Sequence, residues 1–131
     1  SVDGWQSDGF DPGLANFFLT LPPGSDIAAV EARLLEELAR VATEGVSAAE
    51  LEKARNLRLA GFWRNLQTIR GKAHALGHFD VFTGDYENLF AIPEDLSNTT
   101  AEQVQAVAAK VFRHDNMTIG ILRSPVDEVE Q

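Results

Sequence analysis

Two histidines four residues apart, His74 and His78, are the side chains in this sequence best suited to chemistry. On a helix this spacing places both imidazoles on one face, as in many zinc sites. A catalytic site also needs a third ligand and a general base. The position that is glutamate in a His-Glu-x-x-His arrangement is Ala75, and the inverted His-x-x-Glu-His does not occur. The pattern therefore favours two partly exposed histidines near a helix end, stabilised by the helix dipole, and it predicts no metal ligand.

Two carboxylates, Asp80 and Asp85, flank the dipeptide Thr83-Gly84. They are candidates for a catalytic pair, but acidic residues beside a glycine turn usually cap the turn and face water. No Ser-His-Asp set and no phosphate-binding glycine loop can be read from the sequence. We therefore predict no catalytic and no cofactor-binding residue in this chain.

Four arginines and two tryptophans are candidates for binding a ligand. The arginines could grip a carboxylate through paired hydrogen bonds, although arginines along a helix more often form its wet face. The tryptophans could mark a peptide-binding groove, although a tryptophan beside a phenylalanine on a helix more often lies in a core. These candidates are Arg55, Arg58, Arg64, Arg70, Trp5 and Trp63. The substrate-binding residues stay unknown at this point.

The central segment, residues 45–84, must position most of these side chains, and its pattern predicts a hairpin of helices. Ser47 and Glu50 form a capping box that satisfies the first free N–H groups of a helix. Apolar residues then recur at spacings of three and four, which aligns them on one helix face. Gly71 and Gly77 weaken a helix, so we expect a bend or break near one of them.

The flanking segments predict strands on both sides of a helical region. Residues 1–12 suggest the end of a strand followed by a loop. The apolar run at 14–21 predicts a buried strand. Residues 117–122 predict a last strand, which is followed by Pro125 and an acidic tail. Ser25 or Asp26 should start a helix that ends at Gly45. Asp85 should start a short helix that Pro93 ends or kinks. Thr99 or Thr100 should start a further helix with a capping box. The predicted fold is α+β, with about three mainly antiparallel strands covered by four or five helices.

Composition limits the classes of partner. The chain has 131 residues, 44% of them hydrophobic, which is enough for one globular domain over residues 1–131. Twenty acidic residues against eleven basic ones give a net charge of −9, which disfavours binding to nucleic acid or to an anionic membrane. There is no cysteine, so disulfides play no part, and periplasm and cytoplasm both stay open as compartments.

Several segments together resemble the pitrilysin/insulinase family of zinc metallopeptidases, the inverzincins. They are residues 1–14 (SVDGWQSDGFDPGL), the helix opening at 45–55, GKAHALG at 71–77, TGDY at 83–86, NTTAEQVQ at 98–105 and the closing MTIGILRSP. The resemblance implies the later part of one of two homologous halves that close around an unfolded peptide. It favours the non-catalytic, C-terminal half, because the chain ends in a predicted strand, a proline and an acidic tail. The zinc motif of the family belongs to the early part of an active half, so its absence from this chain is expected in either half. No functional residue of the family can be carried onto a position of this chain.

The resemblance implies that the parent protein is a zinc-dependent endopeptidase, with zinc held in its catalytic half and this chain inactive on its own. The expected partners are that catalytic half and a peptide or unfolded polypeptide. Two alternatives stay open: a peptide-binding or assembly scaffold of the same fold that does not hydrolyse, and an unrelated acidic α+β interaction domain. A chain that starts at Ser1 with so thin a sheet suggests a segment of a longer protein. Its exposed strand edge should make it self-associate.

Overall fold

The computed structural model describes residues 1–6, 9–11 and 13–123, and in this part of the chain it confirms an α+β fold. The strands are β1 (Val2–Gln6) and β2 (Ala15–Leu19). The α-helices are α1 (Ile27–Glu44), α2 (Ala48–Asn65), α3 (Ile69–Thr83), α4 (Ile92–Asn98) and α5 (Ala101–Val111). Short 3-10 helices, η1 (Tyr86–Ala91) and η2 (His114–Asn116), complete the described elements. None of the described helices is long and apolar enough to span a bilayer.

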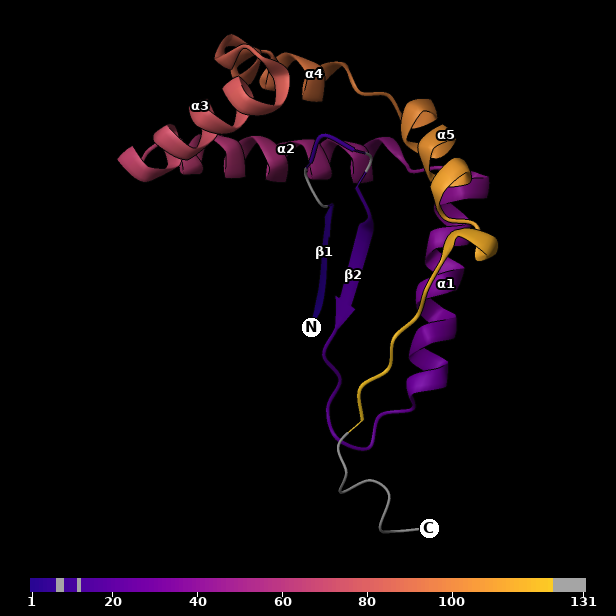
Figure 1. Ribbon diagram of the computed structural model, residues 1–131. Helices are drawn as coiled ribbons and strands as arrows, with labels where there is room; N and C mark the ends of the chain where they lie inside the picture. Colours follow the sequence, from indigo (N-terminus) through magenta and orange to yellow (C-terminus); the bar gives the residue numbers. More distant parts are fainter. Residues whose placement is uncertain (7–8, 12, 124–131) are drawn as a thin grey trace.

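The helices form two groups that meet where α1 leads into α2 (Figure 1). In one group α1 packs against α5. In the other, α2 packs against α4, and α3 packs against η1. The β1–β2 hairpin extends away from the α2 group as a narrow ribbon rather than lying under a layer of helices (Figure 1).

The sheet is thinner than the sequence predicts. In the described residues it contains two antiparallel strands, with Val2 opposite Leu19 and Gln6 opposite Ala15. Residues 117–122 are not part of the ladder, so the predicted third strand is wrong. This segment starts in extended backbone at Met117, but Ile121 is 51% exposed, so little apolar burial favours its docking on β2. Pro125 and the acidic tail lie outside the described residues.

The predicted burial of the second strand is also wrong. Phe17 is 40% exposed and Phe18 59% exposed, although the apolar run around them is typical of a buried strand. Phe17 makes one edge-to-face contact, with Phe112 after α5, at 5.9 Å between ring centroids. An apolar sequence is buried only if another layer covers it, and here the described residues provide that layer on one face at most.

The helix starts follow the predicted caps. Asp26 caps α1 by accepting a hydrogen bond of 3.1 Å from Ala29 N–H, and Gly45 ends α1 at a positive φ of 76°. Thr100 and Gln103 form the capping box of α5. The break in the central hairpin lies at residues 66–68, where Thr68 caps α3 three residues before Gly71. A Cβ on Gly71 would overlap the carbonyl oxygen of Asn65, so glycine here allows the start of α3 to lie against the end of α2.

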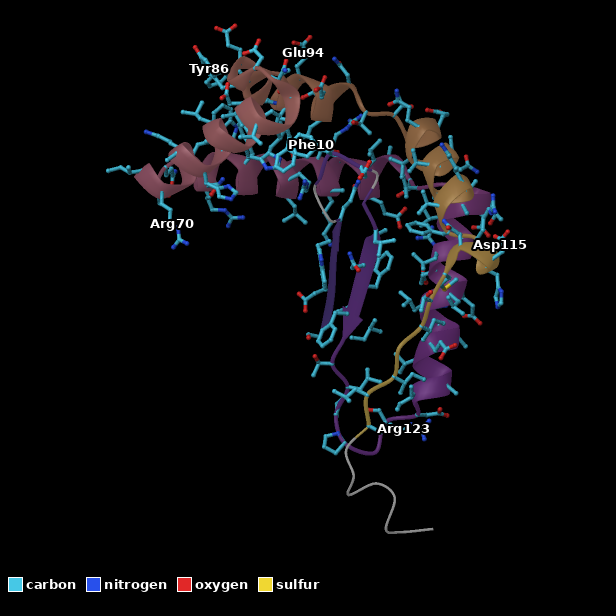
Figure 2. The ribbon with its side chains drawn as sticks, in the orientation of Figure 1. Phe10, Arg70, Tyr86, Glu94, Asp115 and Arg123 are labelled. Carbon is cyan, nitrogen blue, oxygen red and sulfur yellow. The ribbon has the colours of Figure 1, made fainter. Side chains whose placement is uncertain are left out.

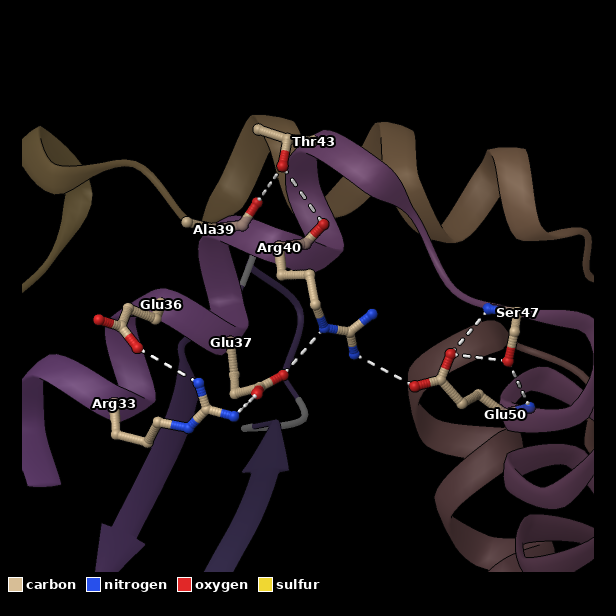
Figure 3. Close-up of polar contacts among 8 residues, drawn as sticks. All are labelled: Arg33, Glu36, Glu37, Ala39, Arg40, Thr43, Ser47 and Glu50. Atoms are coloured by element: carbon tan, nitrogen blue, oxygen red, sulfur yellow. Dashed lines mark hydrogen bonds and ion pairs between the residues drawn. The ribbon is translucent and has the colours of Figure 1, made fainter.

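A chain of hydrogen bonds and ion pairs joins α1 to the start of α2 (Figure 3). The Glu50 carboxylate accepts from the backbone N–H of Ser47 at 2.7 Å and from its hydroxyl at 2.8 Å. Arg40 donates to Glu50 at 3.2 Å and to Glu37 at 3.0 Å. The Ser47 hydrogen bonds, more than the attraction of Arg40, lower the pKa of Glu50.

We expect the contacts of Glu50 with Ser47 and Arg40, which join α1 to α2, to weaken in acid. The lowered pKa means that folded Glu50 stays ionised where the unfolded residue, with a pKa of about 4.3, is already protonated. Its stabilisation is therefore complete above that value and is lost as pH falls through the folded pKa. Urea unfolding at a series of pH values should show a flatter acid limb for Glu50→Gln than for Glu52→Gln, the control on the same helix. Equal acid limbs in the two variants would contradict this assignment.

The interior is small. Among the described residues, the buried apolar side chains are Ala75, Leu89 and Ala108. The accessible surface is 10521 Å², whereas a compact monomer of this length exposes about 6,800 Å². The excess of about 3,700 Å² includes apolar surface, because large apolar side chains such as Ile69, Phe90 and Ile121 are more than half exposed.

Candidate functional site

A groove between α2 and α4 is the best candidate for a binding site. The groove is open to solvent and has a volume of about 430 Å³. The α2 wall includes Gly61, whose missing side chain leaves open space between the two helices. The residues lining the groove are Leu57, Arg58, Gly61, Phe62, Asn65, Ile92, Asp95, Leu96 and Thr99.

The groove combines an apolar lining with polar groups from both helices. Leu57 is 60% exposed, so its side chain is available to a ligand rather than used in a core. Arg58 contributes a positive charge from α2, and Asp95 a negative charge from α4. This arrangement suits a ligand that carries apolar side chains together with amide or charged groups, as a polypeptide does.

Arg55 holds the groove together and does not line it. Its guanidinium donates a hydrogen bond to the carbonyl of Thr99, at the end of α4. Thr99 in turn donates to the carbonyl of Asp95 through its backbone N–H, at 3.0 Å, and through its hydroxyl, at 2.9 Å. The Nε atom of Arg55 is buried and has no hydrogen-bond partner among the described residues. The wet-face interpretation is therefore wrong for Arg55.

The other three arginines are exposed, as predicted for a wet face. Arg64 donates to the carbonyl of Ala60 on its own helix at 3.2 Å. Arg58 lies at the groove, and Arg70 projects outward near the start of α3 (Figure 2). Arg55 and Arg64 donate to carbonyls on different helices, and Arg58 is the one arginine of the four that lines the groove, so the described residues do not form a shared arginine clamp.

The two histidines share one face of α3, as their spacing predicts. Their rings are stacked at 6.3 Å between centroids with an interplanar angle of 13°. His78 also contacts Phe82 at 4.6 Å, and Phe82 contacts Phe10 at 4.8 Å, so the pair continues an aromatic row. In the described part of the chain, no group of three or more histidine, cysteine, aspartate or glutamate side chains is placed to hold a metal ion. Two histidines do not fit a catalytic zinc centre, and we assign no zinc-dependent step to them.

Two solved structures are similar to this one over most of its length. One is the inactive peptidase domain of a protein assigned as a zinc protease from Bordetella parapertussis, with 26% identity and a TM-score of 0.73. The match covers 95% of this chain and 70% of that one. The other is a protein assigned as a zinc protease from Bordetella pertussis Tohama I, with 27% identity and a TM-score of 0.77, covering 94% of this chain and 68% of that one. The chain shares the fold of an inactive peptidase domain of a zinc protease.

This match confirms the resemblance that the sequence segments indicate. It also removes the interpretation of an unrelated α+β interaction domain. No protein-family model matches the chain, and no curated protein matches it.

The two acidic residues, Asp80 and Asp85, take part in different local contacts. Asp85 caps η1 by accepting a hydrogen bond of 2.8 Å from the backbone N–H of Glu87, which confirms the capping interpretation for Asp85. The backbone carbonyl of Asp80 accepts from Gly84 N–H at 3.0 Å and closes the end of α3. Gly84 adopts a positive φ of 76° there, a typical helix end.

Both tryptophans are surface residues. Trp63, beside Phe62 on α2, is 54% exposed, so the core interpretation is wrong for it, and Trp5 is equally exposed. Trp63 contacts Phe62 edge to face at 4.9 Å, beside the groove, whereas Trp5 lies on β1. The two tryptophans therefore belong to different surfaces.

The α4 side of the groove could not be predicted from the sequence. Ile92, Leu96 and Asp95 come from a helix too short to show a clear apolar face. The available signal was on α2: Leu57 interrupts a polar run, and Gly61 follows four residues later on the same face. A large apolar residue and a glycine at this spacing on a wet face indicate a surface that another group covers.

Proposed function

We propose that this chain is a non-catalytic domain of a zinc endopeptidase and forms part of the wall of its substrate chamber. The observation that carries the proposal is the match over 95% of the chain to an inactive peptidase domain of a zinc protease. The parent protein would hydrolyse polypeptides with zinc bound in another, catalytic domain. The partners of this chain would be that domain and an unfolded polypeptide.

Two features of the α2–α4 groove, and the net charge of the chain, support polypeptide as the bound class. Exposed and half-buried apolar side chains, including Leu57 and Ile92, can accept apolar side chains of a substrate. Arg58 and Asp95 can pair with peptide carbonyls, amides or charged side chains. The net charge of −9 disfavours the other common extended polymer, nucleic acid.

The test is binding of a fluorescently labelled, reduced and alkylated polypeptide, followed by anisotropy. Leu57→Asp places a charge in the groove and should weaken binding by about tenfold, the equivalent of about 1.4 kcal/mol. Val81→Asp is the matched control, because Val81 is 61% exposed on α3 and does not line the groove. It should leave binding unchanged. Undetectable binding by the unmodified chain, or equal loss in both variants, would overturn the proposal.

A further inference from the structure

One edge of β1 faces away from its partner strand. The terminal ammonium of Ser1 donates to the carbonyl of Thr20 at 2.9 Å, and Thr20 N–H donates back to Ser1 at 3.1 Å, so this is a hydrogen-bonded pair. Bonded and non-bonded pairs alternate along an antiparallel ladder, so Asp3 and Trp5 also point their backbone groups at β2. The backbone groups of Val2, Gly4 and Gln6 then point the opposite way, toward an edge on which the described residues place no strand.

This edge carries the features that native proteins usually avoid. An open strand edge is a template for another strand, and proteins commonly block it with proline, lysine or a bulge. β1 reads Val-Asp-Gly-Trp-Gln, with one charged residue and none of these blocks. Next to it, Val2 is 66% exposed, Trp5 54% and Phe18 59%, so apolar side chains line both faces beside the edge.

Apolar side chains beside the edge give a second copy a surface to cover. Val2, Trp5 and Phe18 are each more than half exposed. A stable interface buries about 800 Å² on each side, so the dimer needs these side chains to be covered in addition to the pairing of the two edges.

We propose that β1 pairs with β1 of a second copy of this chain, antiparallel and about a two-fold axis at Gly4. In this register Gly4 lies opposite Gly4 of the second copy, and Val2 lies opposite Gln6. Every outward N–H and C=O of these three residues then finds a partner, and the two hairpins form one four-stranded sheet.

The register is compatible with the side chains as well as with the backbone. Asp3 lies opposite Trp5 of the second copy, so no acid directly faces an acid. Glycine occupies the axis, where two side chains would otherwise meet. The centre is open to a small side chain, because a Cβ on Gly4 would lie 3.6 Å from the Phe17 ring, an ordinary contact distance.

A single introduced cysteine tests both the pairing and its register, since the chain has no cysteine of its own. With Gly4→Cys the two Cα atoms would be about 5.5 Å apart, within the range of a disulfide. With Val2→Cys the two cysteines lie four residues apart along the strands, more than about 13 Å, which is too far. After mild oxidation, Gly4→Cys should give at least about tenfold more disulfide-linked dimer than Val2→Cys on a non-reducing gel.

Sedimentation of the unmodified chain and of Gly4→Pro provides the second measurement. Proline removes an N–H that points outward, so it breaks the proposed dimer while leaving the β1–β2 bonds in place. We expect a dimer for the unmodified chain and a monomer for Gly4→Pro. An unmodified chain that stays monomeric at high concentration would overturn the proposal, as would equal cross-linking of the two cysteine variants. Either result would mean that the edge stays open or accepts a different partner.

Discussion

Replacing Gly71 by alanine should destabilise the fold by about 3 kcal/mol, one of the two largest effects expected of a single substitution here. A Cβ at this position overlaps the backbone carbonyl of Asn65 and lies too close to its side chain. The backbone at the end of α2 cannot rotate away as a side chain can, so α3 must shift. Alanine favours a helix over glycine by only about 1 kcal/mol, which is too little to offset the clash.

Gly77→Ala is the matched control, because Gly77 lies in the same helix and its Cβ would meet no atom within 4 Å. This variant should gain up to about 1 kcal/mol from helix propensity. Urea unfolding of both variants, followed by circular dichroism, gives the two free energies. If the two substitutions changed stability in the same direction, the close approach of α3 to Asn65 would be wrong.

Leu89→Ala should cost about 2 to 3 kcal/mol, the second large effect. Leu89 is 3% exposed in η1, and it is the largest buried side chain among the described residues. It lies where η1 packs against α3, so its removal leaves a cavity at the contact that holds the end of the central hairpin. We place the cost toward the lower end of the usual range, because a site in so small a core can partly collapse.

The neighbouring Phe90 provides the control for Leu89. It is larger but 61% exposed, so Phe90→Ala removes little buried surface and should cost less than about 1 kcal/mol. The comparison uses the midpoint and slope of urea unfolding for each variant. A larger loss for Phe90→Ala than for Leu89→Ala would mean that a partner covers Phe90 and that the apolar surface of η1 is an interface.

The helix caps could be predicted from the sequence because each depends on residues three positions apart. Ser47 and Glu50 need only each other and the first turn of α2, and the same holds for Thr100 and Gln103. Hydrogen bonding within one turn leaves few alternatives. The chain segments that resemble inverzincins were likewise enough to indicate the fold that the structural match confirms.

The parts that depend on distant segments could not be predicted. Arg55 contacts Thr99 from 44 positions away, and nothing near Arg55 in the sequence distinguishes it from a solvated arginine. The groove likewise needs α2 and α4 to meet. The apolar run around Phe17 and Phe18 would be a buried strand if other strands and helices covered it, but both side chains are exposed. The eight residues of the run do not tell which other segments pack against them.

The central claim is that this chain supplies binding surface and no metal chemistry of its own. The most direct test is a calorimetric titration of the full chain with zinc, repeated with His74→Ala. The account predicts the same heat for both, with no tight one-to-one binding, because two stacked histidines have no third ligand among the described residues. Tight one-to-one binding that His74→Ala abolishes would contradict it and would identify α3 as a metal site.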